Sequence, residues 1–310
     1  MPTIFLITGI AVHPLAYCEA SNETTKQAIA IPNLFISSDS EGFNATKIGG
    51  AYLPNYEHGD SYYGLTTQYN QYSQNGWSAT GSQVGVVVKD VNTHTGLGYN
   101  ANLGVNVISG SSVLTTDSSY GFAVTKTTRF ELLLNRDRVE TQNSITNGIY
   151  YTLLGASIEQ QVVDRFTLVG MLGNMYFSDG NTRPLFRARA VYDLLPDYGV
   201  TAQIRYRQYS DTNTNVVNNY FNPDSYNETM LALGIKQKVN GWLLSGTAGI
   251  GRQTVNADPS TTTQLLEASA TSPFTSGIFF RARVGYSRSA GFNGPDYSYS
   301  YFLNELIFSF

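Results

Sequence analysis

The chain has 310 residues, of which 14% are charged and 13% are aromatic, with one cysteine. Soluble domains are about 25% charged, so this chain is unusually poor in charge for that class. Its 22 tyrosines and 16 phenylalanines exclude a disordered chain. No run of about 18 apolar residues follows the first twenty positions, which excludes a helical membrane protein. The net charge of −4 offers nucleic acid no basic field, so no nucleic-acid partner is expected.

The first twenty residues have the pattern of a secretory signal peptide. An apolar stretch at residues 4–12 is followed by Cys18 and Ala20, and these small residues fit cleavage after Ala20. No Lys or Arg precedes Lys26, so a buried first strand is the alternative interpretation. A lipoprotein anchor at Cys18 is disfavoured because the bulky Tyr17 stands before it. A processed chain would have no cysteine and therefore no disulfide.

After this segment, apolar residues recur with a period of two. In residues 97–107 the odd positions are Leu, Tyr, Ala, Leu, Val and Val, whereas the even positions are Gly or Asn. The same alternation is found in residues 186–193, 200–207, 242–251 and 280–287. A period of two predicts β-strands with one apolar and one polar face. The period of 3.6 that indicates helices does not recur, and no linker divides the chain.

Turn signals separate these stretches at intervals of roughly 15 to 20 residues. They are Asn75-Gly76, Asp164-Arg165, residues 179–181, residues 196–199, Asn240-Gly241 and residues 294–296. The spacing predicts about 14 to 16 strands between Thr46 and Phe310, 16 being favoured, each long enough to cross a bilayer when tilted. The predicted fold is all-β, an antiparallel transmembrane β-barrel over residues 43–310. A signal peptide (1–20) and a short periplasmic segment (21–42) would precede it.

Aromatic residues at the ends of the apolar faces argue against a soluble β-sandwich, whose strands also alternate. Tyr99, Tyr192, Tyr206, Trp242 and Tyr286 fringe the apolar positions. Tyr and Trp collect at the two interfaces between lipid and water. The pattern therefore predicts a barrel that contacts membrane lipid.

The last residues support the same prediction. Phe302, Leu306, Phe308 and Phe310 share one parity, with Asn304 as the exception. This ending resembles the carboxy-terminal signature of Gram-negative outer-membrane barrels. The resemblance implies location in the bacterial outer membrane, with Phe308 and Phe310 as a signal for the barrel-assembly machinery.

The polar parity would line a lumen, and it carries similar numbers of basic and acidic residues. They are Arg187, Arg189, Arg205, Arg207, Arg281, Arg283, Glu131, Asp193, Glu228, Glu267 and Glu305. Mutual pairing that rigidifies the wall is the favoured interpretation, and guidance of an anionic solute is the alternative. Neutral polar residues share this face: Asn100, Asn102, Asn106, Gln203, Tyr209 and Gln253. Such amides and rings suit a sugar, and equally the filling of a small barrel by its own side chains.

The histidines do not indicate catalysis or a metal site. His13 falls in the predicted signal peptide, and His94 lies in a predicted turn. His58 has Glu57 and Asp60 beside it, but adjacent positions of a hairpin turn cannot all converge on one ion. No strand carries a histidine that could serve a lipase-like serine. We expect no enzymatic activity, no cofactor and no metal.

A more specific resemblance lies in the last ninety residues. Its motifs are the aromatic-proline segment 220–226, the strand 229–239, the run Gly241-Trp242-Leu243-Leu244-Ser245 and the segment 249–253. Together they resemble the carboxy-terminal barrel of bacterial porins that export exopolysaccharides such as cellulose and poly-N-acetylglucosamine. Those subunits usually carry a tetratricopeptide array before the barrel. Here only Ser21 to about Gly42 precedes the first predicted strand, so a separate periplasmic scaffold would deliver the polymer from an inner-membrane glycosyltransferase.

The leading hypothesis is therefore a passive outer-membrane conduit for an extracellular polysaccharide. A general or solute-specific porin is the first alternative. The second is a structural or adhesive barrel whose Asn-rich loop, residues 211–225, contacts partners.

Overall fold

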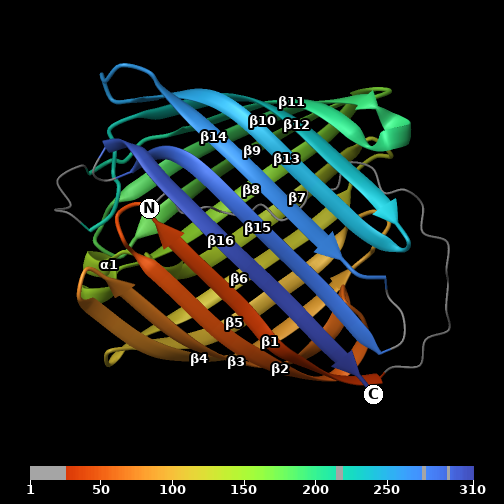
Figure 1. Ribbon diagram of the computed structural model, residues 1–310, viewed down its shortest axis with the longest axis horizontal. Helices are drawn as coiled ribbons and strands as arrows, with labels where there is room; N and C mark the ends of the chain where they lie inside the picture. Colours follow the sequence, from red (N-terminus) through yellow and green to blue (C-terminus); the bar gives the residue numbers. More distant parts are fainter. Residues whose placement is uncertain (1–25, 214–218, 274–276, 292–293) are drawn as a thin grey trace.

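The computed structural model describes residues 26–213, 219–273, 277–291 and 294–310. The predicted signal peptide, with Cys18 and His13, lies outside the described residues. The described chain forms sixteen antiparallel strands in one closed barrel (Figure 1). The strands β1 to β8 are Lys26–Asp39, Asn44–His58, Ser61–Gln74, Trp77–Val91, Gly98–Ile108, Ser111–Ala123, Thr128–Arg138 and Tyr150–Val163. The strands β9 to β16 are Phe166–Phe177, Thr182–Leu195, Val200–Tyr209, Tyr226–Val239, Trp242–Val255, Thr261–Thr271, Ile278–Gly291 and Gly294–Ser309.

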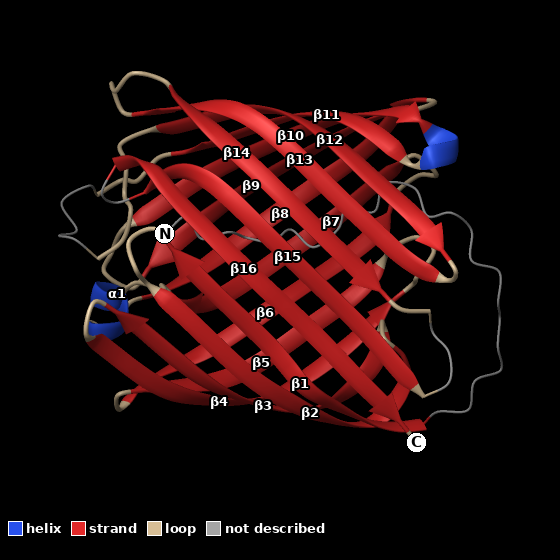
Figure 2. Cartoon of the chain, viewed as in Figure 1, coloured by secondary structure: helices blue, strands red, loops and turns tan. Residues whose placement is uncertain are grey.

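Each strand pairs with its neighbours in sequence, and β1 pairs with β16 to close the barrel. Ile29 lies opposite Phe308 and Ile36 opposite Phe302 across this closing seam. Two short helical turns interrupt the strands, α1 (Gln142–Thr146) and the 3-10 turn η1 (Pro196–Tyr198), and Figure 2 shows them at opposite ends of the barrel. No helix within the described ranges is long and apolar enough to span a bilayer. The all-β barrel with sixteen strands confirms the predicted fold class.

The barrel begins earlier than predicted. Residues 26–39, expected to lie before the barrel as part of a periplasmic segment, form β1. The register of β1 shifts between Ala30 and Leu34, around Pro32. This irregularity breaks the alternation of side chains, which explains why the sequence pattern does not reveal the strand.

Several turns have the backbone conformation that their residues favour. Asn75-Gly76 and Asn240-Gly241 both have positive φ at the two central positions, as two-residue hairpins of this type require. The predicted turn at residues 294–296 is displaced, because β16 already begins at Gly294. Residues 211–225 connect β11 to β12, as expected.

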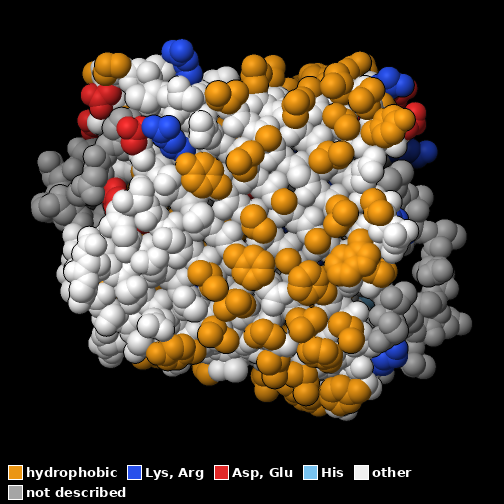
Figure 3. All heavy atoms as spheres, in the orientation of Figure 1, with side chains coloured by type: hydrophobic (Ala, Val, Ile, Leu, Met, Phe, Trp, Pro, Cys, Tyr) orange, Lys and Arg blue, Asp and Glu red, His pale blue; other side chains and the backbone are white. Residues whose placement is uncertain are grey.

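The outer face is apolar. On β11 the outward Ile204 is 53% exposed whereas its inward neighbour Gln203 is 7% exposed, and Leu231 on β12 is 62% exposed. Figure 3 shows apolar side chains spread over the wall, with charged side chains gathered at its two ends. Large apolar side chains facing outward over the whole wall are what a lipid environment requires.

We call the two ends of the barrel the Phe310 end and the α1 end. At the Phe310 end, β1 begins and β16 ends, and Phe310 exchanges backbone hydrogen bonds with Gln27. The α1 end carries the connections 40–43, 75–76, 109–110, 139–149, 178–181, 210–225 and 256–260. Buried apolar side chains gather inside the barrel near both ends, around Phe279 at the Phe310 end and around Ile145 and Phe177 at the α1 end.

Candidate functional site: the lumen and its two ends

The residues predicted to line the lumen all have inward parity on their strands. On β10, for example, the outward residues Phe186 and Tyr192 are exposed, and Arg187 and Arg189 alternate with them. The others with inward parity are Arg205, Arg207, Arg281, Arg283, Glu131, Asp193, Glu228, Glu267, Glu305, Asn100, Asn102, Asn106, Gln203, Tyr209 and Gln253. Their contact with a transported substrate stays a prediction.

The middle of the lumen is accessible to solvent. The inward Asp117 on β6 is exposed, and the side chain of Arg207 keeps 23% of its surface accessible. On β3 and β4, Gln68 and Gln83 lie directly opposite each other and are half-buried. Polar side chains that remain accessible inside a closed barrel indicate a water-containing interior.

Four arginines form the most concentrated charge in the lumen, and we call them the arginine patch: Arg187, Arg189, Arg205 and Arg207. In the register of β10 and β11, Arg187 lies opposite Arg207 and Arg189 lies opposite Arg205. Arg207 forms an ion pair with Glu228 at 2.7 Å. Arg205 donates two hydrogen bonds to Oε1 of Gln203, at 3.0 and 2.8 Å. Within the described ranges, Arg189 and Arg205 form no ion pair with an acid.

Two other lumen arginines, Arg129 and Arg281, are paired. Arg129 contacts Glu159 at 3.4 Å, and Arg281 contacts Glu305 at 3.3 Å. Glu267 accepts a hydrogen bond from the Tyr301 hydroxyl at 3.1 Å. The lumen thus combines paired charges that brace the wall with the arginine patch, where positive charge exceeds negative charge.

A turn folds inward at the Phe310 end. Asp60, in the turn between β2 and β3, contacts Nζ of Lys89 at 2.5 Å and Nη2 of Arg281 at 2.9 Å. A Cβ atom on Gly59 would lie 2.5 Å from the ring of Phe279, so only glycine fits at this position. Burial opposes ionisation of Asp60, but the charges of Arg281 and Lys89 together lower its pKa well below the usual range. The network ties β2, β4, β15 and β16 together across this end.

The pH dependence of Asp60→Asn tests this network. A carboxyl whose pKa is lower in the folded state stabilises the fold above its unfolded pKa of about 3.9, and this contribution is lost as pH falls through the folded pKa. At pH 7 we expect the variant to unfold at a lower temperature than the wild type, measured by heat-modifiable gel migration. The difference should shrink steadily below about pH 4. A pH-independent difference would contradict the assigned role of Asp60.

At the other end, the segment of residues 139–149, which we call the α1 segment, crosses the mouth. The side chain of Thr141 caps α1 by accepting a hydrogen bond from the Ser144 amide at 3.1 Å. Ile145 is 3% exposed and packs with Phe43, Ala45, Tyr72, Ala79 and Ile108. These partners include residues of β2 and β3, yet the segment joins β7 to β8. Four strands separate β2 from β7 in the barrel order, so the segment reaches across the lumen.

An ion pair fixes the α1 segment to the opposite wall. Glu140 contacts Nζ of Lys47 on β2, and the two side chains are 16% and 18% exposed. The Tyr72 hydroxyl donates to Glu140 at 3.5 Å, and Nζ of Lys47 lies 5.5 Å from the ring centre of Phe35. A half-buried ion pair with an additional donor holds the segment far more firmly than an exposed pair would.

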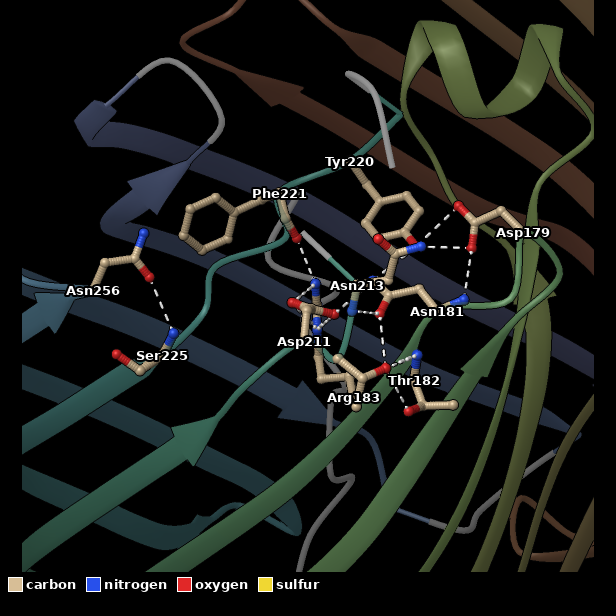
Figure 4. A network of polar contacts seen from close by, with 11 residues as sticks. Asp179, Asn181, Thr182, Arg183, Asp211, Asn213, Tyr220, Phe221, Ser225 and Asn256 are labelled. Atoms are coloured by element: carbon tan, nitrogen blue, oxygen red, sulfur yellow. Dashed lines mark hydrogen bonds and ion pairs between the residues drawn. The ribbon is translucent and has the colours of Figure 1, made fainter. Parts of the chain in front are cut away.

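The described residues of the connection between β11 and β12, 210–213 and 219–225, also fold inward. Figure 4 shows Arg183, Asp211 and Asn181 pointing toward one another beside Tyr220. Arg183 contacts Asp211 at 2.9 Å, with side chains 6% and 0% exposed. The Tyr220 ring stacks on Phe177 with ring centres 4.4 Å apart. Burial raises the pKa of Asp211 above its usual value, against the opposing charge of Arg183.

The loop and the α1 segment contact each other. The backbone carbonyl of Asn219 accepts hydrogen bonds from the hydroxyls of Thr141 and Ser144, the latter at 2.7 Å. Asn147 donates to the Asn219 side chain at 3.0 Å. Two connections that start from different strands therefore meet across the α1 end and narrow it.

The two described histidines lie at or beside connections between strands. Nδ1 of His58 accepts a hydrogen bond from the Asp60 backbone at 3.2 Å, whereas the Asp60 carboxylate points to Lys89 and Arg281. His94 is in the connection between β4 and β5. Within the described ranges, no three His, Cys, Asp or Glu side chains are grouped as a metal site would need.

Sequence reasoning missed the α1 segment and the pairs that hold both ends, namely Lys47–Glu140, Lys89–Asp60 and Arg183–Asp211. The motif Thr141-x-x-Ser144 and the isolated Ile145 within a polar stretch are weak local signals for the segment. The partners of these pairs lie on distant strands, so the local pattern does not connect them.

The chain is similar to known proteins in its structure. No protein-family model matches the sequence, and no curated protein matches it. A solved structure described as a bacterial polysaccharide outer membrane secretin has a TM-score of 0.67 and 14% identity, covering 94% of this chain and 99% of that chain. The outer membrane protein OprD from Pseudomonas aeruginosa has a TM-score of 0.45 and 11% identity, covering 92% and 94%. The likeness to the secretin shows the fold, a closed antiparallel β-barrel, and the apolar outer wall is that of a barrel that spans a membrane.

Proposed function

We propose that this barrel is an outer-membrane channel that exports an extracellular polysaccharide. The observation that carries the proposal is the polar lining of the middle of the lumen, which solvent still reaches. The amides of Gln68, Gln83 and Asn102 can exchange hydrogen bonds with hydroxyl groups. A hydrated sugar chain needs such contacts along its path.

The lengths of the connections support an orientation. Outer-membrane barrels have short periplasmic turns and longer extracellular loops. The two longest connections, 139–149 and 210–225, both lie at the α1 end. The α1 end would therefore face the cell exterior, and the Phe310 end would receive the polymer from the periplasm. We propose that a periplasmic scaffold and an inner-membrane glycosyltransferase deliver the polymer to this end.

A solute-specific porin is the second candidate, and the narrowed α1 end favours it. Two inward-folded connections would limit passage to small molecules if they stayed in place. An exporter instead requires them to move aside when polymer arrives from the periplasm. The two candidates therefore differ in whether the α1 segment opens.

The experiment is a secretion assay in a strain that lacks the gene, combined with liposome swelling by the purified protein. Export predicts that extracellular polysaccharide is lost and restored by the wild-type gene. A porin predicts normal secretion and liposomes that swell with small sugars. Normal secretion without swelling would contradict both candidates and favour a structural barrel.

Removal of the final aromatic residue tests the proposed assembly signal. Phe308 and Phe310 are 41% and 66% exposed on the outer face. We expect Phe310→Ala to lower the amount of folded barrel in the outer membrane several-fold, because the assembly machinery would recognise the strand poorly. Phe302→Ala removes an outward aromatic from the same strand and serves as control. Equal amounts of the two variants would contradict an assembly role specific to the chain end.

A further inference from the structure

The arginine patch concentrates positive charge on two adjacent strands. Directly opposite side chains in an antiparallel pair have Cβ atoms about 5 Å apart, and like charges at that spacing repel. The register places two such Arg–Arg pairs next to each other, Arg187–Arg207 and Arg189–Arg205. Glu228 pairs with Arg207. This ion pair leaves Arg189 and Arg205 without an acidic partner within the described residues.

The strands beside β10 and β11 place apolar residues directly opposite three of these arginines. On β9, Val169 lies opposite Arg189 and Met171 lies opposite Arg187. On β12, Met230 lies opposite Arg205. The charges of Arg205 and Glu159 act on Arg189, and those of Glu267 and Glu228 act on Arg205, without forming an ion pair with either arginine in the described structure. Glu159 lies on β8, two strands away, where it pairs with Arg129.

Not every hydrogen-bond donor of the patch has a partner in the described structure. The buried Nε of Arg207 has no hydrogen-bond partner in the described structure. Arg205 donates only to Gln203, a neutral acceptor. An Arg guanidinium is a planar fork that matches a carboxylate, phosphate or sulfate group and binds it in a bidentate manner.

We propose that Arg189 and Arg205, with Arg207 beside them, form a binding site for oxyanion groups inside the lumen. The transported polymer would then be an acidic polysaccharide that carries carboxylate, phosphate or sulfate groups. This inference rests on the proposed function and names its substrate class. The wall of β3 to β5 presents the amides of Gln68, Gln83 and Asn102 to the sugar hydroxyls, while the patch holds the acidic groups.

The test is the ion current through the purified barrel in planar bilayers. Under a KCl gradient, the reversal potential of the wild type should show a preference for Cl⁻ over K⁺. Oligogalacturonate and dextran sulfate should block the current at much lower concentrations than neutral dextran. In Arg189→Gln/Arg205→Gln, we expect the anion preference to fall and the half-blocking concentration to rise about tenfold or more, the effect of losing one charge-assisted contact.

Two variants control for charge and for folding. Arg189→Lys/Arg205→Lys keeps both charges and should keep the Cl⁻ preference, while losing part of the block because an ammonium cannot bind in a bidentate manner. Arg288→Gln removes a positive charge at the exposed Arg288–Asp296 pair and should change neither quantity. Heat-modifiable gel migration shows whether each variant is folded.

The outcomes separate this inference from the proposed function. A folded wild-type barrel without current would contradict the channel itself. A current that acidic and neutral oligomers block equally, unchanged in Arg189→Gln/Arg205→Gln, would leave the channel intact and overturn the oxyanion site. Stronger block by oligogalacturonate than by dextran sulfate would assign the site to carboxylates, and the reverse order to sulfates.

Discussion

Replacing Glu140 with glutamine is expected to raise the ion conductance of the barrel several-fold. Breaking a fully buried ion pair by removing one partner costs about 3–5 kcal/mol, because the remaining charge is left uncompensated. In Glu140→Gln that charge is Lys47. Breaking the half-buried Lys47–Glu140 pair should cost less than this, but more than breaking an exposed pair. Burial of Ile145 contributes about 1.5–3 kcal/mol toward holding the α1 segment on the opposite wall. The segment should therefore leave the mouth much more often, and single-channel currents in planar bilayers would record it.

A double variant and a matched control make this prediction specific. Lys47→Met/Glu140→Gln removes both charges, so it should raise the conductance less than Glu140→Gln alone. Arg288→Gln/Asp296→Asn removes an ion pair whose side chains are 39% and 75% exposed. Exposed pairs contribute about 0–1 kcal/mol, so no change is expected there. Wild-type conductance in Glu140→Gln would mean that the ion pair does not hold the segment.

Replacing Arg183 with methionine should release the loop between β11 and β12. The Asp211 side chain is fully buried and would lose its cationic partner, at a cost of about 3–5 kcal/mol. The contacts of the Arg183 guanidinium with the rings of Tyr209 and Phe177, at 4.9 and 5.2 Å, would also be lost. Limited proteolysis should cut the folded variant within residues 210–225 at concentrations that leave the wild type intact.

The effect of Arg183→Met should depend on pH. The pKa of Asp211 is already raised by burial, and it should rise further without the opposing charge of Arg183. A group whose folded pKa is raised adds stability below its unfolded pKa, about 3.9, and loses it as pH rises through the folded pKa. Proteolysis of the variant should therefore be fast at pH 8 and slower near pH 4.

A second substitution shows whether the buried charge causes the effect. Arg183→Met/Asp211→Asn carries no charge at either position, so its loop should resist proteolysis better than that of Arg183→Met at pH 8. Equal cleavage of the two variants at pH 8 would contradict the assigned role of the Asp211 charge.

The fold was predictable because alternation is a local property of each strand. The residues two positions before and after Arg189 on β10, or Arg205 on β11, show which face of the sheet it lies on. The same holds for Ala190 and Ile204 on the opposite face. β1 was not recognised, since its register shift near Pro32 interrupts that period. A tilted strand of about 9 to 11 residues is enough to cross a bilayer, whereas the observed strands extend to sixteen residues in Gly294–Ser309.

The arrangement inside the lumen was only partly predictable. The parity of Arg205 and Arg207 places them on the inner face, but the partner of each depends on the neighbouring strand and its register. Glu228 lies opposite Arg207, whereas Met230 lies opposite Arg205.

Asp60 and Arg281 are far apart in sequence and meet because β1 and β16 close the barrel. The Asn-rich loop suggested an outward surface, yet its residues Tyr220 and Phe221 are buried.

The most direct test of the channel is the current through the purified wild-type barrel in a planar bilayer. The same preparation should first show heat-modifiable migration, which establishes that the barrel is folded. A channel predicts discrete steps of current, and these steps should become larger in Glu140→Gln. A folded wild-type barrel that leaves the bilayer silent would contradict a transport function.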